Sequence, residues 1–165
     1  MNLGQTLLTL AAMMILTQLA VRVNSNVLQT QEVMQNSKFG LVAASLATST
    51  IEEANKLAFD AKTVDDAVTS VNQLTASNLL GPESGETKLA DFNDFDDFNG
   101  YKYFDTTLSS AHFNISCLVQ YVDPPNLNSY TLTRSYHKKL TVFVSSKSMQ
   151  DTVKVSTVFS YWKYR

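Results

Sequence analysis

The sequence predicts an α+β protein in which a long N-terminal α-helix precedes a C-terminal antiparallel β-sheet. Residues 3–21 are apolar and uncharged, and apolar residues then recur at helical spacing to about residue 60. From residue 101 onward apolar and polar residues alternate, as in half-buried strands. We expect the apolar first half of the helix to protrude, and its second half to pack on one face of the sheet.

These patterns divide the chain into three segments. Residues 1–60 are the N-terminal helix, in which 1–25 form a membrane or filament-core segment. Residues 61–100 connect the helix to the sheet, with a short helix predicted over 64–80, a Gly/Pro loop at 79–85 and an acidic loop after it. Residues 101–165 form the sheet domain. Its predicted strands lie at 101–105, 113–121, 140–144 and 153–161, with a turn at 148–151.

Two details are predicted within the second half of the helix. Glu52 and Lys56 are placed to form an i,i+4 ion pair. Small residues recur at spacings of three and four along one face, which suits close backbone approach by another element. That element is either a neighbouring molecule or the chain's own sheet. The small residues are Gly40, Ala43, Ala44 and Ala47.

Composition excludes several classes of function. A net charge of −2 provides no basic field, so no nucleic acid is indicated as a partner. The single cysteine, Cys117, cannot form an intrachain disulfide and is predicted to be a buried structural thiol. No catalytic motif is present, and His112 and His137 are predicted to be ordinary strand residues, so we do not expect an enzyme.

The opening stretch has three possible interpretations. A cleavable secretory signal requires a basic start, which the segment from Met1 to Gln5 lacks. A membrane anchor fits its length, since nineteen helical residues span about 28 Å and Arg22 is the first charge. The core of a helical filament also fits, because the helical pattern continues far beyond residue 21 and its first half lacks an intramolecular partner.

In this architecture the chain resembles a type IV pilin or pseudopilin. Leu3 matches the usual apolar third residue, whereas Gln5 stands where the family usually has a glutamate that neutralises the terminal amine of the adjacent subunit. The prepilin leader does not precede Met1 in this numbering: either it has been removed, or Met1 is the initiator. The scattered polar residues, including Gln5, are either helix–helix contacts or simply tolerated.

The resemblance implies a homo-oligomer: the subunit of an extracellular helical filament at the cell surface, held in the inner membrane before assembly. The alternative is a single-pass, membrane-anchored extracytoplasmic domain or a minor pseudopilin of a secretion system. Either role would use the apolar face of the first sixteen residues. The expected assembly residues are Met1, Leu3, Gln5, Leu7, Leu8, Leu10, Met13, Met14 and Leu16.

An acidic loop is the most distinctive short stretch. It offers four carboxylates and two amides within nine residues and is closed by Gly100, a donor set that suits Ca²⁺ but lacks the EF-hand spacing. Major pseudopilins are similar in carrying a calcium site in a loop of this region. The alternative is a structural loop pinned by the phenylalanines at 92, 95 and 98; no other cofactor is indicated. The candidate ligands are Asp91, Asn93, Asp94, Asp96, Asp97 and Asn99.

Overall fold

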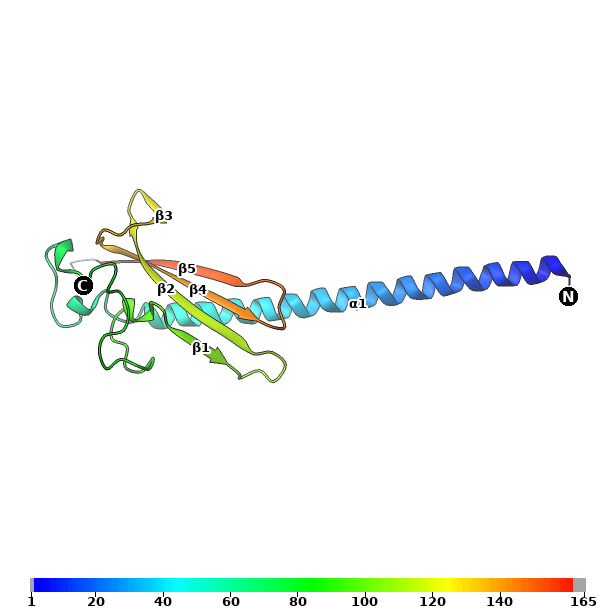
Figure 1. Cartoon of the computed structure of the whole chain (residues 1–165), viewed down its shortest axis with the longest axis horizontal. Helices are drawn as coiled ribbons and strands as arrows, with labels where there is room; N and C mark the ends of the chain where they lie inside the picture. Colours follow the sequence, from blue (N-terminus) through cyan, green and yellow to red (C-terminus); the bar gives the residue numbers. More distant parts are fainter. Residues whose placement is uncertain (1, 162–165) are drawn as a thin grey trace. The chain divides into compact units, whose positions relative to one another are not determined.

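The computed structural model describes residues 2–161, which form one long N-terminal helix followed by an antiparallel sheet (Figure 1). Helix α1 runs over Leu3–Ala54. The chain divides into two units, residues 1–38 and 39–165, so the last part of α1 belongs to the same unit as the sheet. We call residues 39–161 of the second unit the head. The strands are β1 (Lys102–Asp105), β2 (Phe113–Asp123), β3 (Asn126–Tyr130), β4 (His137–Ser146) and β5 (Val153–Ser160).

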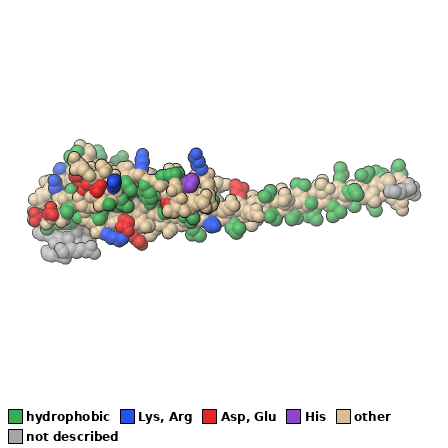
Figure 2. Space-filling model, turned by 90° about the horizontal axis from the view of Figure 1, so that it is seen from below, with side chains coloured by type: hydrophobic (Ala, Val, Ile, Leu, Met, Phe, Trp, Pro, Cys, Tyr) green, Lys and Arg blue, Asp and Glu red, His purple; other side chains and the backbone are tan. Residues whose placement is uncertain are grey.

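The first unit is helical from Leu3 onward, and none of its described side chains is buried. Apolar side chains run along this part of α1 (Figure 2). The helix is long and apolar enough to cross a membrane, and its most apolar window is wholly unburied. The sequence explains the helix itself, because between Gly4 and Gly40 it contains no glycine and no proline to interrupt the backbone hydrogen bonds.

The sheet of the head is antiparallel throughout, in the order β1-β2-β4-β5, with the short β3 paired to the end of β2. The alternation of apolar and polar residues sets the register between the central strands. Ile115 pairs with Val144, Cys117 with Val142, and all four of these side chains are buried. A shift by one residue would turn the apolar row to solvent, so burial fixes this pairing.

The core of the head lies between the sheet and the last part of α1, as the sequence predicts. Phe39 meets the ring of Phe113 edge-on, with 6.5 Å between ring centroids. The hydroxyl groups of Thr50 and Tyr103 lie 3.1 Å apart across the same contact. Four helix residues, Ala43, Ala47, Ile51 and Ala54, are buried in this core.

The structure corrects the small-residue face. Ala43 and Ala47 are fully buried against the chain's own sheet, but a Cβ added at Gly40 would meet no atom within 4 Å. Gly40 therefore does not belong to the face that packs on the sheet. The ion pair is also different from the prediction, since Lys56 binds Glu53, one helical turn away, with 2.7 Å between Nζ and Oε1.

Helix α1 ends at Ala54, six residues before the predicted end. The chain leaves the helix because Ala58 forms a parallel bridge with the acidic loop: its N–H donates to the carbonyl of Asn93, and its carbonyl accepts from Phe95 N–H. The acidic loop thus supplies hydrogen-bond partners for the backbone N–H and carbonyl of Ala58. A helix that continued through Ala58 could not form these two bonds.

The predicted helix over 64–80 is wrong. The segment instead contains one 3₁₀ turn, Val71–Gln73, and a second turn, Ala61–Thr63, directly precedes the segment. Each turn follows a capping residue, Ser70 or Asp60, that forms a capping box. These caps satisfy the local N–H groups without a longer helix. Strand β3, which the sequence analysis did not identify, follows the turn at Pro124 and Pro125.

Candidate functional site

The acidic loop is held against the head by its phenylalanines, as one of the two interpretations of the sequence expects. Phe95 and Phe98 are fully buried and Phe92 nearly so. The rings of Phe92 and Phe98 meet edge-on at a centroid distance of 5.3 Å, and Phe95 packs on Phe159 of β5. Because the rings alternate with aspartates in the sequence, fixing the rings also forces carboxylates into the interior.

Two of these carboxylates organise the loop. Asp94 accepts hydrogen bonds from the backbone N–H of Asp96 at 2.7 Å and of Asp97 at 3.3 Å. Asp97 in turn accepts from the N–H of Asn93 at 2.9 Å and of Asp94 at 3.0 Å. This reciprocal arrangement forms the short turn η3 (Asp96–Phe98) and leaves one oxygen of each carboxylate free to face elsewhere.

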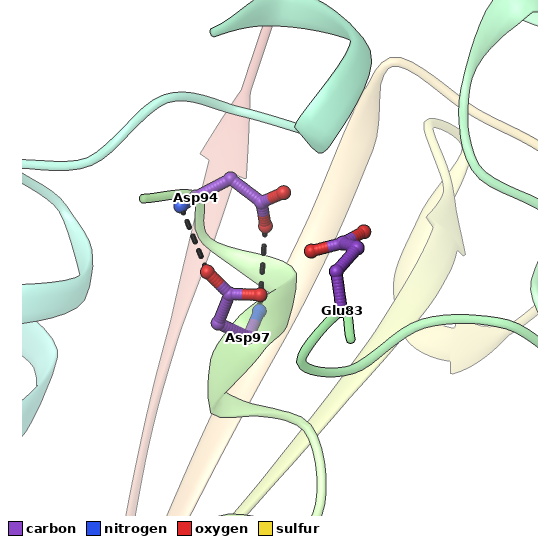
Figure 3. A group of neighbouring side chains, drawn as sticks. All are labelled: Glu83, Asp94 and Asp97. Atoms are coloured by element: carbon purple, nitrogen blue, oxygen red, sulfur yellow. Dashed lines mark hydrogen bonds between the residues drawn. The ribbon is translucent and has the colours of Figure 1, made fainter. Parts of the chain in front are cut away.

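A third carboxylate, Glu83, comes from the loop after Gly81 and faces Asp94 and Asp97 (Figure 3). One oxygen from each of the three lies within 4.8 Å of the others. Asp94 and Asp97 are fully buried, and Oδ2 of Asp94 and Oδ1 of Asp97 are buried atoms without a hydrogen-bond partner. Such unpaired buried oxygens are costly unless a proton or a cation compensates them.

The electrostatics of the three groups agree with this geometry. Burial, with nearby Asp96 and Asp97, raises the pKa of Asp94 from 3.8 to about 9. Burial and the hydrogen bond to Glu86 raise the pKa of Glu83 from 4.5 to about 7. Without a counter-charge, Asp94 therefore keeps its proton at neutral pH and Glu83 is about half ionised. A bound cation would favour the ionised form of both groups.

The donor set fits a hard divalent cation. Carboxylate oxygens bind Ca²⁺ at about 2.3–2.6 Å, so two ligands on opposite sides of the ion lie at most about 5 Å apart. The three oxygens meet that limit. Three carboxylates supply only part of the six to eight oxygens that Ca²⁺ takes. Water has access from the side of Glu83, which is exposed, and would complete the shell.

The other predicted ligands lie elsewhere. Asp91 is exposed and accepts from the N–H groups of Thr87 and Lys88. The Asn93 side chain binds Glu86, and Asp96 turns to Lys138. The Asn99 amide bridges Leu80 carbonyl and Val119 N–H. Sequence reasoning missed Glu83, because nothing local links it to residues eleven positions later.

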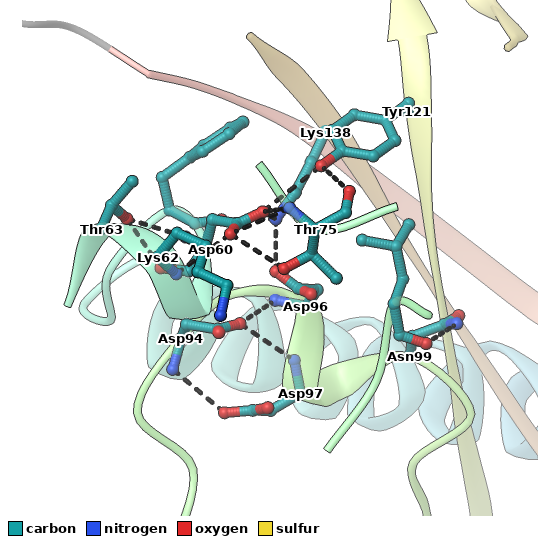
Figure 4. Close-up of polar contacts among 12 residues, drawn as sticks. Asp60, Lys62, Thr63, Thr75, Asp94, Asp96, Asp97, Asn99, Tyr121 and Lys138 are labelled. Carbon is teal, nitrogen blue, oxygen red and sulfur yellow. Dashed lines mark hydrogen bonds and ion pairs between the residues drawn. The ribbon is translucent and has the colours of Figure 1, made fainter. Parts of the chain in front are cut away.

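A second charge cluster lies beside the first. Lys138 of β4 is fully buried, and its Nζ donates to Asp60 Oδ2 and the Phe59 carbonyl, each at 2.8 Å, and to Asp96 Oδ1 (Figure 4). Burial opposes ionisation of Asp60, but Lys138 and backbone donors outweigh it and lower the Asp60 pKa. Lys138 pairs in register with Tyr121, so it continues the inward-facing row of Leu140, which is a signal the sequence analysis overlooked.

The expected assembly residues lie on the first unit of the chain. Met1 is outside the described residues. Gln5 accepts a long hydrogen bond, 3.5 Å, from Asn2 N–H. The Thr6 and Thr17 hydroxyls donate to carbonyls of their own helix, which agrees with their being tolerated polar residues. The large apolar members are all exposed: Leu3, Leu7, Leu8, Leu10, Met13, Met14 and Leu16.

The remaining singled-out residues are structural. Cys117 is buried, and burial raises the pKa of its thiol to about 12, so it is not a reactive cysteine. His137 opens β4 and its Nδ1 lies 2.7 Å from the Ser160 hydroxyl. His112 directly precedes β2 and packs on Phe104.

Neither protein-family models, nor curated proteins, nor solved structures yield a match to this chain. Inferences about its function therefore stand on the apolar helix and on the two buried charge clusters.

Proposed function

We propose that this chain is the structural subunit of an extracellular helical filament, which its N-terminal helix holds together after leaving a membrane. The observation that carries the proposal is the charge-free surface of α1 between Leu3 and Val21, about 28 Å long. Its leucine and methionine side chains are 56–77% exposed. So large an apolar surface requires lipid or other protein around it.

The head does not need this surface. Its own core closes between the end of α1 and the sheet. Exchange of lipid for neighbouring helices is nearly neutral in hydrophobic free energy, because lipid tails are as apolar as leucine. Packing between helices and contacts between heads would therefore direct assembly. Each subunit would contact its neighbours through two different surfaces, and such contacts extend into a filament unless the rotation closes a ring.

Electron microscopy of material sheared from the cell surface tests the proposal. We expect filaments that contain the full chain, and none from a chain lacking residues 1–25, whose head would be a soluble monomer. Cysteines introduced at Leu7 and Met14 should cross-link the assembled chain into a ladder beyond the dimer. The buried Cys117 provides an unreactive background for this measurement.

The alternative function is a monomeric, membrane-anchored extracytoplasmic domain, including a minor pseudopilin of a secretion system. It draws on the same apolar helix, which also suits a single membrane span. In that case shearing would release no filaments, the chain would stay with the membrane fraction, and the double-cysteine variant would remain mainly monomeric. Those results together would favour a membrane-anchored domain over the subunit of a filament.

We also propose that Glu83, Asp94 and Asp97 bind a divalent cation, and that Ca²⁺ fits them best. The supporting observation is the pair of buried, unpartnered oxygens on Asp94 and Asp97. Added CaCl₂ should raise the melting temperature of the head and a chelator should lower it; a concentration of 100 times Kd corresponds to about 2.7 kcal/mol. Asp97→Asn should abolish the response, and Asp91→Asn, outside the group, should keep it. A response unaffected by Asp97→Asn would exclude this site.

A further inference from the structure

Lys138 lies in an unusual environment for an ammonium group. It occupies an inward-facing position of β4, between the Phe59 and Tyr121 rings, whose centroids lie 4.6 Å and 5.4 Å from Nζ. Its side chain is fully buried, and so are those of Asp60 and Asp96, with which it pairs. Figure 4 shows the three side chains converging from β4, from the start of the 3₁₀ turn Ala61–Thr63 and from the acidic loop.

The two aspartates beside Lys138 differ sharply. Asp60 is held by several other donors: Lys62 N–H at 3.1 Å, Thr75 N–H and hydroxyl at 3.0 Å and 2.9 Å, and the Tyr121 hydroxyl at 3.3 Å. Asp96 accepts from Lys138 and also interacts with the side chain of Asp94, and its Oδ2 is a buried atom without a hydrogen-bond partner. Asp60 is thus a fixed carboxylate, whereas Lys138 is the cation that Asp96 contacts.

We propose that Lys138 and Asp96 become joined by an intramolecular amide bond, with Asp60 as the proton relay. Nζ passes one proton to the paired carboxylate of Asp96, and the free amine attacks Cγ of the resulting carboxylic acid. Asp60 Oδ2, 2.8 Å from Nζ, then takes a second proton from the nitrogen and passes it to the leaving hydroxyl. A bond forms between Nζ and Cγ, and a bond between Cγ and one carboxylate oxygen breaks. That oxygen leaves as water with two protons of the ammonium group, one of them passed on by Asp60, and the third proton stays on the amide nitrogen.

The step is balanced without any external reagent, since an ammonium–carboxylate pair and an amide differ by one water. Three features of the site favour it. The reacting groups are already in contact, which replaces a bimolecular encounter by an intramolecular one. Burial makes the charges of Lys138 and Asp96 costly, and the amide removes both of them, while Asp60 keeps its donors from Lys62, Thr75 and Tyr121. The surrounding rings of Phe59 and Tyr121 exclude the water that would reverse the reaction.

The product would connect two parts of the head that lie 42 residues apart in sequence. It would tie β4, a central strand, to the loop that precedes β1. The chain has one cysteine and cannot form an intrachain disulfide, so this bond would be its covalent cross-link. The inference does not depend on the proposed filament or on cation binding.

The mass of the intact, denatured full-length protein tests the inference directly. We expect about 18 Da, one water, less than the sequence mass. A complete digest with trypsin should then contain residues 89–102 joined to residues 135–139, because the modified Lys138 is no longer cleaved. A wild-type mass equal to the sequence mass would overturn the proposal and leave an ion pair in its place.

Matched variants identify the bond. Lys138→Arg should restore the full mass, whereas Lys139→Arg, one residue along the same strand, should keep the loss. Asp96→Asn should lose about 17 Da, since ammonia replaces water as the leaving group. Asp60→Asn should slow the appearance of the loss in freshly refolded protein. A loss of about 18 Da that persists in Lys138→Arg would come from aspartate cyclisation elsewhere and would also overturn the proposal.

Discussion

The two units of this chain distribute apolar and charged side chains in opposite ways. Between Leu3 and Val21 the first unit exposes its leucines and methionines and contains no charge. The head buries an apolar core but also encloses Lys138 and four aspartates, all fully buried: Asp60, Asp94, Asp96 and Asp97. The comparison shows that each unit is incomplete in its own way: the first lacks an apolar partner, and the acidic side of the head lacks positive charge.

The largest effect is expected from removing the nitrogen of Lys138. Lys138→Ala takes the ammonium group, or the amide that it forms with Asp96, out of the cluster and leaves Asp60 and Asp96 buried without a positive partner, a change that typically costs about 3–5 kcal/mol. Urea unfolding of the head should show the loss, whereas Lys139→Ala should stay within about 0.5 kcal/mol of the wild type. If the two variants unfold at the same urea concentration, Lys138 does not hold the cluster together.

A charge placed in the first unit should impair membrane integration and assembly, and it should leave the stability of the head unchanged. Leu10→Arg puts a guanidinium at a 59% exposed position in the middle of the apolar stretch, at a cost of about 2.5–3.5 kcal/mol in a membrane. We expect loss of membrane integration and of assembly, with an unchanged melting temperature of the head. Leu10→Ile is the control that keeps both. An Arg variant that still integrates and assembles would mean that water reaches this surface.

The pH dependence of the head should reveal its missing positive charge. Asp94 and Glu83 have pKa values raised to about 9 and about 7. A raised carboxyl pKa stabilises the folded state below the unfolded value, near 4, and that stability is lost as pH rises through the folded values. The melting temperature of the cation-free head should therefore be lower at pH 8 than at pH 6. Added CaCl₂ should reduce this difference in melting temperature. Equal stability at both pH values without calcium would contradict these shifts.

The smallest effects on the stability of the head are expected from substitutions on two faces of α1, one that packs on the sheet and one that does not. Ala43 is fully buried against the sheet, so Ala43→Leu should destabilise the head by about 1–3 kcal/mol through overpacking. Gly40→Leu enters open space and should leave the head unchanged, or stabilise it by up to about 1 kcal/mol through better helix propensity. Loss of assembly by Gly40→Leu, with an intact head, would show that a neighbouring molecule approaches there.

The sequence predicted those parts of the fold that depend on periodicity. The apolar helix, the alternation in β2, β4 and β5, and the pinning phenylalanines all depend on patterns that a short window contains. The end of α1 was missed because the backbone of Asn93, far along the chain, captures Ala58. The helix predicted over 64–80 is wrong because the capping box at Ser70 satisfies the backbone locally around the turn Val71–Gln73.

The candidate site was harder to predict, for a similar reason. The acidic loop was recognisable, but only Asp94 and Asp97 of the six candidate ligands meet, and their third partner, Glu83, lies in another loop. The buried position of Lys138 could have been predicted from the sequence. Alternate residues of a strand share a face, so Lys138 lies on the same inward-facing side of β4 as Leu140 and Val142. A charged residue in an apolar row marks a buried partner that the sequence alone does not name.

Helix α1 precedes all the strands in the sequence, and this order has a consequence for biosynthesis. Phe39, Ala43 and Ile51 find their partners only in segments from residue 92 onward, most of them in β2 and β4. At about 5–20 residues per second, the ribosome needs several seconds to make those partners after the helix itself is complete. During that interval the first half of α1 can already enter a membrane, while the second half waits with its apolar face uncovered. The order of synthesis therefore completes the apolar first half of α1 before the head closes.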